Sequence, residues 1–162
     1  MTAPRRQRKR SCRGLIGGLV LLALGVGARA ATTEYLVTDR YSGLAISGFD
    51  PVAYFTDATP VLGRDDLEYR HAGAVWRFRN EGNRAAFVAD PNVYMPRFGG
   101  YDPIKVARGT GVPGDPRFWV IAQDRLYLFF NEEDRAEFAD NAEAAAAAAE
   151  RNWPAVQLTL SP

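Results

Sequence analysis

Two aromatic-rich hairpin patterns constrain the fold of this chain more than any other feature. They are LEYRHAGAVWRFRN, residues 67–80, and RFWVIAQDRLYLFF, residues 117–130. Each pattern places aromatic and β-branched residues, which favour strands, on both sides of a short turn. The turns are expected near Ala72-Gly73 and near Gln123-Asp124. The sequence therefore predicts two small antiparallel hairpins.

Helical patterns accompany the hairpins. Asn80 is a suitable cap for a helix over Glu81–Ala89, which Asp90-Pro91 stops, and Asp50-Pro51 begins a second short helix. The alanine-rich tract at 142–150 predicts a C-terminal helix, capped by Asn131 and ended by Pro154. Its apolar stripe consists of Phe138, Ala142, Ala145, Ala149 and Trp153. The fold class is α+β, with small antiparallel β-hairpins packed with short helices and a C-terminal Ala-rich helix.

Residues 1–30 have the pattern of a signal peptide. A basic run is followed by a short apolar run, Leu15 to Val26, and then by Ala28-Arg29-Ala30. We expect cleavage after Ala30, by general secretion rather than twin-arginine export, and a periplasmic or secreted product that meets the membrane only during export. A retained signal anchor is the alternative, but the apolar run is shorter than the ~20 residues of a spanning helix.

Charge and cysteine content exclude several functions. Removal of the leader leaves 13 Lys and Arg against 19 Asp and Glu, a net charge of −6. This balance argues against nucleic acid, which needs a basic surface. Cys12 is the single cysteine and lies in the leader, so the mature chain can form neither a disulfide nor a thiolate metal site. No internal repeat or linker is recognised, and we expect one domain over residues 31–162.

The glycine-rich stretch 97–116 raises the question of a phosphate cradle. Gly109 to Gly114 satisfies the spacing GxGxxG. A dinucleotide site needs a strand before this motif and a helix after it, whereas a predicted strand follows Gly114. Pro113 also removes one backbone donor. A loop is the better interpretation of this segment.

Tyrosines beside glycine and proline are the best candidates for a binding cleft. A buried tyrosine needs a hydrogen-bond partner for its hydroxyl, and an aromatic cleft with a few polar groups is a typical ligand site. We expect such a cleft around Tyr54, His71, Tyr94, Tyr101 and Asp102. The plainer interpretation of Asp102 is a cap of the turn before Pro103.

Several sequence strings together resemble one known family. GFDPVAYF, YRHAGAVWRF, AFVADPNVYMPRFGGYD, GDPRFWVI and LYLFF follow one another as in exported stand-alone YHS-domain proteins. The resemblance spans about residues 47–153. It implies a compact α+β domain related to heavy-metal-associated modules, but it does not imply a reaction.

The chain departs from the metal-binding relatives at their cysteines. Ala53, Arg79 and Asn83 occupy the positions of the three thiolates, and Asp102 follows Gly-Gly-Tyr where the exported branch usually has cysteine. The resemblance therefore implies a family pocket whose reactive or ligating group has become a carboxylate.

Three functions follow from these patterns. The leading hypothesis is a non-catalytic periplasmic domain without a cofactor, which binds a small molecule or a periplasmic protein through the aromatic cleft. The first alternative is weak binding of a copper ion by His71, Met95 and Asp102. The second is an enzyme that uses Asp102 as acid or base, although the sequence shows no cooperating second group.

Overall fold

The computed structural model describes residues 36–160, which belong to one compact unit. The predicted signal peptide lies outside the described residues. In chain order the elements are η1 (Ile46–Gly48), α1 (Ala53–Thr56), β1 (Arg64–His71), β2 (Ala74–Phe78), α2 (Glu81–Ala89), α3 (Pro91–Tyr94), η2 (Arg97–Gly100), α4 (Pro103–Ala107), β3 (Asp115–Ala122), β4 (Arg125–Phe129), α5 (Glu132–Asp140) and α6 (Ala142–Gln157). Of the helices described, none combines the length and the apolar composition that crossing a bilayer requires.

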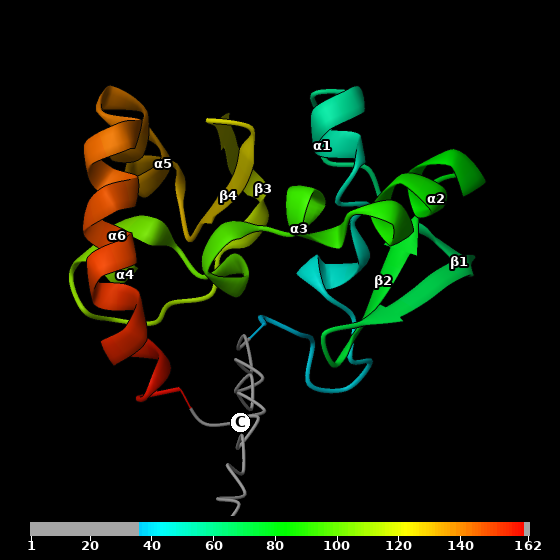
Figure 1. Ribbon diagram of the computed structural model, residues 1–162, viewed down its shortest axis with the longest axis horizontal. Helices are drawn as coiled ribbons and strands as arrows, with labels where there is room; N and C mark the ends of the chain where they lie inside the picture. Colours follow the sequence, from blue (N-terminus) through cyan, green and yellow to red (C-terminus); the bar gives the residue numbers. More distant parts are fainter. Residues whose placement is uncertain (1–35, 161–162) are drawn as a thin grey trace, which may run out of the picture. The chain divides into compact units, whose positions relative to one another are not determined.

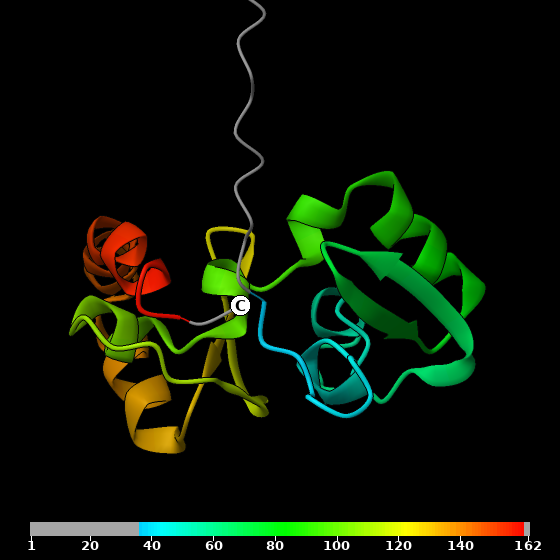
Figure 2. The same cartoon turned by 90° about the horizontal axis from the view of Figure 1, so that it is seen from below.

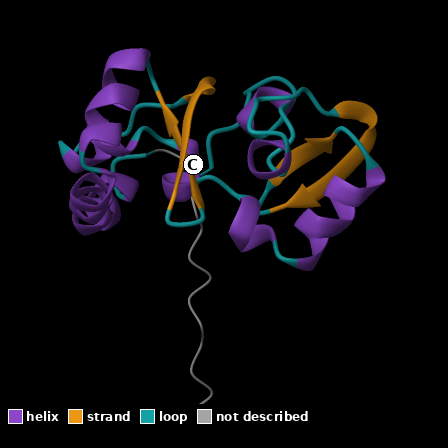
Figure 3. Cartoon of the chain, turned by 90° about the horizontal axis from the view of Figure 1, so that it is seen from above, coloured by secondary structure: helices purple, strands orange, loops and turns teal. Residues whose placement is uncertain are grey.

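The strands form two separate antiparallel hairpins, β1 with β2 and β3 with β4 (Figure 3). Both turns lie where the sequence predicts them, and the chain there adopts left-handed backbone angles, with φ of 51° at Ala72 and 50° at Gln123. The α+β class is thereby confirmed. Helix α2 also has its predicted bounds and its predicted cap, Asn80.

The chain contains an internal repeat, so the expectation that it has none is wrong. The order 3-10 helix, short helix, two strands and two helices occurs twice, once from η1 to α3 and once from η2 to α6 (Figure 1). We call residues 45–94 the first module and residues 97–157 the second module. Residue n of the first module corresponds to n + 52 up to Ala53 and to n + 51 from Val61 onward.

Backbone geometry supports this correspondence. Ile46, Ser47 and Gly48 have φ of 43°, 54° and 78°, while Phe98, Gly99 and Gly100 have φ of 54°, 62° and 86°. The next hydrogen bonds match as well, because the N–H of Asp50 donates to Val61 O at 2.8 Å and the N–H of Asp102 donates to Val112 O at 2.9 Å. Both modules therefore begin with the same left-handed turn.

The sequence also carries a short trace of the repeat. The pattern Phe-x-Asn-Glu-x-x-Arg-Ala-x-Phe occurs at 78–87 and again at 129–138. In each copy the asparagine side chain caps the following helix, accepting at 2.8 Å from the N–H of Asn83 or of Asp134. The last phenylalanine of each copy, Phe87 or Phe138, is fully buried. The shared residues are those that the module needs for a cap and a core.

The β3–β4 hairpin contributes to both hydrophobic cores. Leu126 and Leu128 pack into the core of the first module, while Tyr127 and Phe129 pack into the core under α5 and α6. Figure 1 shows this hairpin between the helices α5 and α6 and the elements of the first module, and Figure 2 shows the same order from below. Both faces of β3–β4 are thus covered, which explains its apolar composition.

The C-terminal helix differs from its prediction in two ways. The segment is divided into α5 and α6 at Asn141, whose backbone angles (φ −154°, ψ 73°) are not helical. The Asn141 side chain caps α6 by accepting a hydrogen bond from Ala144 N–H. Asp90 has nearly the same backbone angles between α2 and α3. Pro154 lies inside α6 rather than ending it. A proline inside a helix removes one N–H donor and crowds the carbonyl of the preceding turn, and burial of Val156 in the second core favours the last turn despite this cost.

Candidate functional site

Asp102 is buried and its carboxylate is used within the fold. Oδ1 accepts hydrogen bonds from the N–H groups of Ile104 at 2.8 Å and Lys105 at 3.2 Å, and Oδ2 accepts one from Phe130 N–H at 2.7 Å. The residue therefore caps α4 and ties it to the end of β4. Burial raises the pKa of Asp102, and the backbone donors oppose that rise. The structure places Asp102 as a cap and not on the rim of a cleft.

Tyr54 is also buried. Its hydroxyl donates to Pro116 O at 2.9 Å, and its ring meets Trp119 edge to face with 5.4 Å between centroids. Burial is the main reason why the pKa of Tyr54 is raised. These contacts join the first module to the β3 strand, so the hydroxyl does not point into a cleft.

The other three predicted residues occupy different places. His71 lies at the end of β1 beside Tyr69 and Phe87, with ring centroids 6.2 and 5.9 Å away. The ring centroid of Tyr94 lies 5.4 Å from that of Phe55, and the ring centroid of Tyr101 lies 5.8 Å from that of Trp153. Within residues 36–160, pockets lie beside Trp153, beside Leu62 and beside Phe118, and none of the five predicted residues lines any of the three. The structure does not gather them into one aromatic cleft.

The proposed copper ligands do not form a cluster either. Met95 is part of the first hydrophobic core, His71 lies at the edge of β1, and Asp102 caps α4. Across the described part of the chain, no three His, Cys, Asp or Glu residues are grouped so that they could hold a metal ion.

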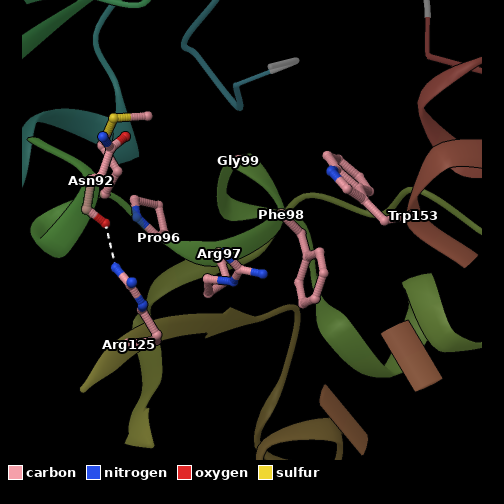
Figure 4. A pocket seen from close by; sticks show the side chains of 8 residues that line it. Asn92, Pro96, Arg97, Phe98, Gly99, Arg125 and Trp153 are labelled. Atoms are coloured by element: carbon pink, nitrogen blue, oxygen red, sulfur yellow. Dashed lines mark hydrogen bonds between the residues drawn. The ribbon is translucent and has the colours of Figure 1, made fainter. Parts of the chain in front are cut away.

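A pocket of about 280 Å³ contains two arginines and an aromatic wall (Figure 4). We call it the arginine pocket; it is lined by Asn92, Met95, Pro96, Arg97, Phe98, Gly99, Arg125 and Trp153. Arg97 and Phe98 come from η2, Arg125 from the first position of β4, and Trp153 from α6. Elements far apart in the sequence therefore build one site.

The two guanidinium groups give the arginine pocket a positive character. Arg125 Nη1 donates to the carbonyl of Asn92 at 2.7 Å, as the dashed line in Figure 4 shows. Arg97 Nη2 donates to Glu150 Oε1 at 2.6 Å, and its guanidinium carbon lies 5.6 Å from the centre of the Phe98 ring. A guanidinium has five N–H donors, so these contacts occupy a minority of those available. One carboxylate neutralises only one of the two cations.

Aromatic rings form the apolar wall of the arginine pocket. Phe98 meets Trp153 edge to face, with 5.7 Å between ring centroids, and the Tyr101 ring also packs against Trp153. The edge and face of such rings accept a flat apolar group, while the guanidinium fork matches a carboxylate or phosphate. The arrangement can thus hold a small anion that also has an apolar part.

The internal repeat shows that the fold does not need these arginines. Arg97 corresponds to Ala45, and Arg125 corresponds to Ala74 at the same position after the hairpin turn. Both alanines are 1% exposed and lie in the first core. The sequence interpretation missed Arg97, Arg125 and Trp153, and recognition of the repeat would have drawn attention to the two arginines.

Comparisons with protein families, curated proteins and solved structures gave no match to this chain.

Proposed function

We propose that this chain is a non-catalytic binding domain that holds a small organic anion in the arginine pocket. The observation that carries the proposal is the replacement of two buried alanines of the first module by Arg97 and Arg125 in the second. Both arginines are partly exposed, and Glu150 and the Asn92 carbonyl take only part of their N–H donors. A bound anion would accept hydrogen bonds from the remaining donors of both guanidinium groups.

The surroundings of the arginines support an organic rather than a simple inorganic anion. Trp153 provides partly exposed apolar surface next to the two cations, while Phe98 and Met95 are buried and contribute little. In a ligand site, charged groups fix the orientation of a molecule whose apolar part lies against an aromatic side chain. An aromatic carboxylate fits this combination, with its carboxylate between the guanidinium groups and its ring against Trp153.

The YHS resemblance and the location outside the cytoplasm are part of the proposal. The resemblance rests on the sequence strings of residues 47–153, and the Asp-Pro pair near their start has a counterpart at the corresponding position of the second module. The basic, apolar and Ala-x-Ala order of residues 1–30 supports export. Mass spectrometry of the exported protein should find Ala31 first, whereas an intact Met1 would contradict cleavage.

Metal binding and catalysis have less support. The family's thiolate positions hold Ala53, Arg79 and Asn83 in the first module, and Lys105, Phe130 and Asp134 in the second. Neither set offers a soft ligand. The residues that line the arginine pocket include no nucleophile or general base of the usual kinds.

Calorimetric titration with two matched probes tests the proposal. Benzoate and benzylamine share a ring and carry opposite charges, so benzoate should bind and benzylamine should not. Arg97→Ala or Arg125→Ala should weaken benzoate binding about tenfold or more, because a charged hydrogen bond contributes about 1.5–3 kcal/mol. Arg117→Ala, on an exposed arginine of β3, is the control and should leave the affinity unchanged.

Two results of this titration would contradict the proposal. Equal affinity of the wild type and of both pocket variants would place benzoate elsewhere. Equal affinity for benzylamine would show that the ring alone is recognised.

A further inference from the structure

Asn83 and Asp134 occupy the same position in the two modules, but they differ in hydrogen-bonding capacity. In the first module Asn83 Nδ2 donates to Asp50 Oδ2 at 2.7 Å. In the second module Asp134 replaces the amide, and Asp102 replaces Asp50. An ionised aspartate can only accept hydrogen bonds. The second module therefore sets two acceptors where the first has a donor and an acceptor.

Asp134 is deeply buried and only half satisfied. It is 2% exposed, and its Oδ1 accepts a hydrogen bond from Lys105 Nζ at 2.9 Å. Its Oδ2 has no hydrogen-bond partner among residues 36–160. Such an atom loses its hydration without compensation, which is costly in a protein interior.

The other charged groups near this pair come from α4 and α5. Arg108 Nη1 lies 4.0 Å from Asp134 Oδ1, but the same guanidinium donates to both oxygens of Glu137 at 2.7 Å. From the end of β4 the pair receives a backbone donor, the N–H of Phe130. Lys105 is therefore the main cation for two buried carboxyl groups.

We propose that Asp102 and Asp134 bind one proton between them, with a hydrogen bond from the Oδ2 of one carboxyl to the Oδ2 of the other. The proton comes from solvent and takes the place of the amide hydrogen of Asn83. It supplies the missing donor and leaves one negative charge for Lys105 to neutralise. Two buried carboxyl groups that share a site cannot both ionise readily.

The directions of the pKa shifts of Asp102 and Lys105 agree with this arrangement. Burial raises the pKa of Asp102, and the negative charge of Asp134 raises it further. The hydrogen bond to Asp134 raises the pKa of Lys105, so the lysine stays charged throughout the range in which Asp102 titrates.

A shared proton makes the stability of the second module depend on pH. Above the ordinary aspartate value of 3.8 the unfolded chain has released this proton, while the folded chain still holds it. Stability rises with pH only where the unfolded state binds more protons, and here the folded state binds more. The contribution is therefore fully present at low pH and is lost as pH rises through the raised pKa of Asp102.

Unfolding of the full-length protein by urea at several pH values tests the proposal with two mirrored variants. Asp134→Asn should reproduce the Asp50–Asn83 arrangement and remove the loss of stability above pH 3.8. Asn83→Asp should create a second buried carboxyl pair and make that loss steeper than in the wild type. Curves for the wild type and Asp134→Asn that run parallel with pH would overturn the proposal.

A measurement on the wild type covers the case in which a variant does not fold. Carbon-13 NMR of the aspartate carboxyl groups should show Asp102 titrating above 3.8, and where Asp134→Asn folds, that titration should move to lower pH. A wild type in which neither carboxyl group of the pair titrates above 3.8 would overturn the shared proton by itself.

Discussion

Two buried aspartates, Asp50 in the first module and Asp102 in the second, make the same hydrogen bonds within their own modules. Each lies before a proline, caps a short helix with Oδ1 and reaches the end of its second strand with Oδ2. An aspartate before a proline is a familiar turn signal, but the local sequence does not show the second bond, which spans 29 residues from Asp50 to Arg79. The structural role thus outweighs the ligand role that the sequence suggests for Asp102.

Replacement of Asp50 should be costly. Asp50→Ala leaves four donors without their acceptor, namely the N–H groups of Val52, Ala53 and Arg79 and the side chain of Asn83. We expect a loss of about 3 kcal/mol or more in the free energy of unfolding, measured with urea. Asp57→Ala is the control, since it removes a surface ion pair with Arg79 and should cost less than about 1 kcal/mol. A loss below about 1 kcal/mol for Asp50→Ala would contradict the capping role.

At the scale of elements, the β3–β4 hairpin explains why the two modules form one unit. Its positions Leu126 and Leu128 correspond to Val75 and Arg77 of the first hairpin. Arg77 is half-buried and pairs with Glu68 at 2.9 Å, whereas Leu128 is buried in the first core. The first module thus covers a face of the second hairpin, and the corresponding face of its own hairpin keeps a charged residue.

This sharing predicts a single cooperative unfolding transition. Phe138→Ala in the second core and Phe87→Ala in the first should each cost about 3–5 kcal/mol, because both rings are fully buried. Each should shift the same calorimetric transition, with the calorimetric and van't Hoff enthalpies equal. Phe130→Ala, whose ring is 54% exposed, is the control and should change stability by no more than about 0.5 kcal/mol. Two transitions, of which only one moves with Phe138→Ala, would show independent modules.

At the scale of the whole molecule, local patterns were predictable and long-range arrangements were not. Both hairpin turns and helix α2 follow from turn residues, strand formers and the Asn80 cap. The repeat was not predicted because the two modules share few residues beyond those that cap helices or fill the cores. A long-range contact explains why Tyr54 is not in the predicted cleft: its hydroxyl donates to the carbonyl of Pro116, which lies 62 residues away in the sequence. No spacing in the sequence indicates such a contact.

The arginine pocket was not predicted from the sequence either. Arg97, Arg125 and Trp153 belong to three elements, and none of them stands in a known motif. Their significance comes from the comparison of the two modules, which places alanine at the positions of both arginines. Asymmetry within a repeat is therefore the best indicator of function in this molecule.

Nitrogen-15 NMR of the labelled protein during titration with benzoate tests whether the arginine pocket binds an organic anion. We predict shifts of the side-chain N–H signals of Arg97, Arg125 and Trp153, and no comparable shift of the Trp76 indole, which is buried in the first core. In Arg125→Ala the same Trp153 shift should need about tenfold more benzoate or more. Shifts confined to Tyr54, His71 and Tyr94, or a Trp153 response with the same benzoate dependence in Arg125→Ala, would contradict binding in the arginine pocket.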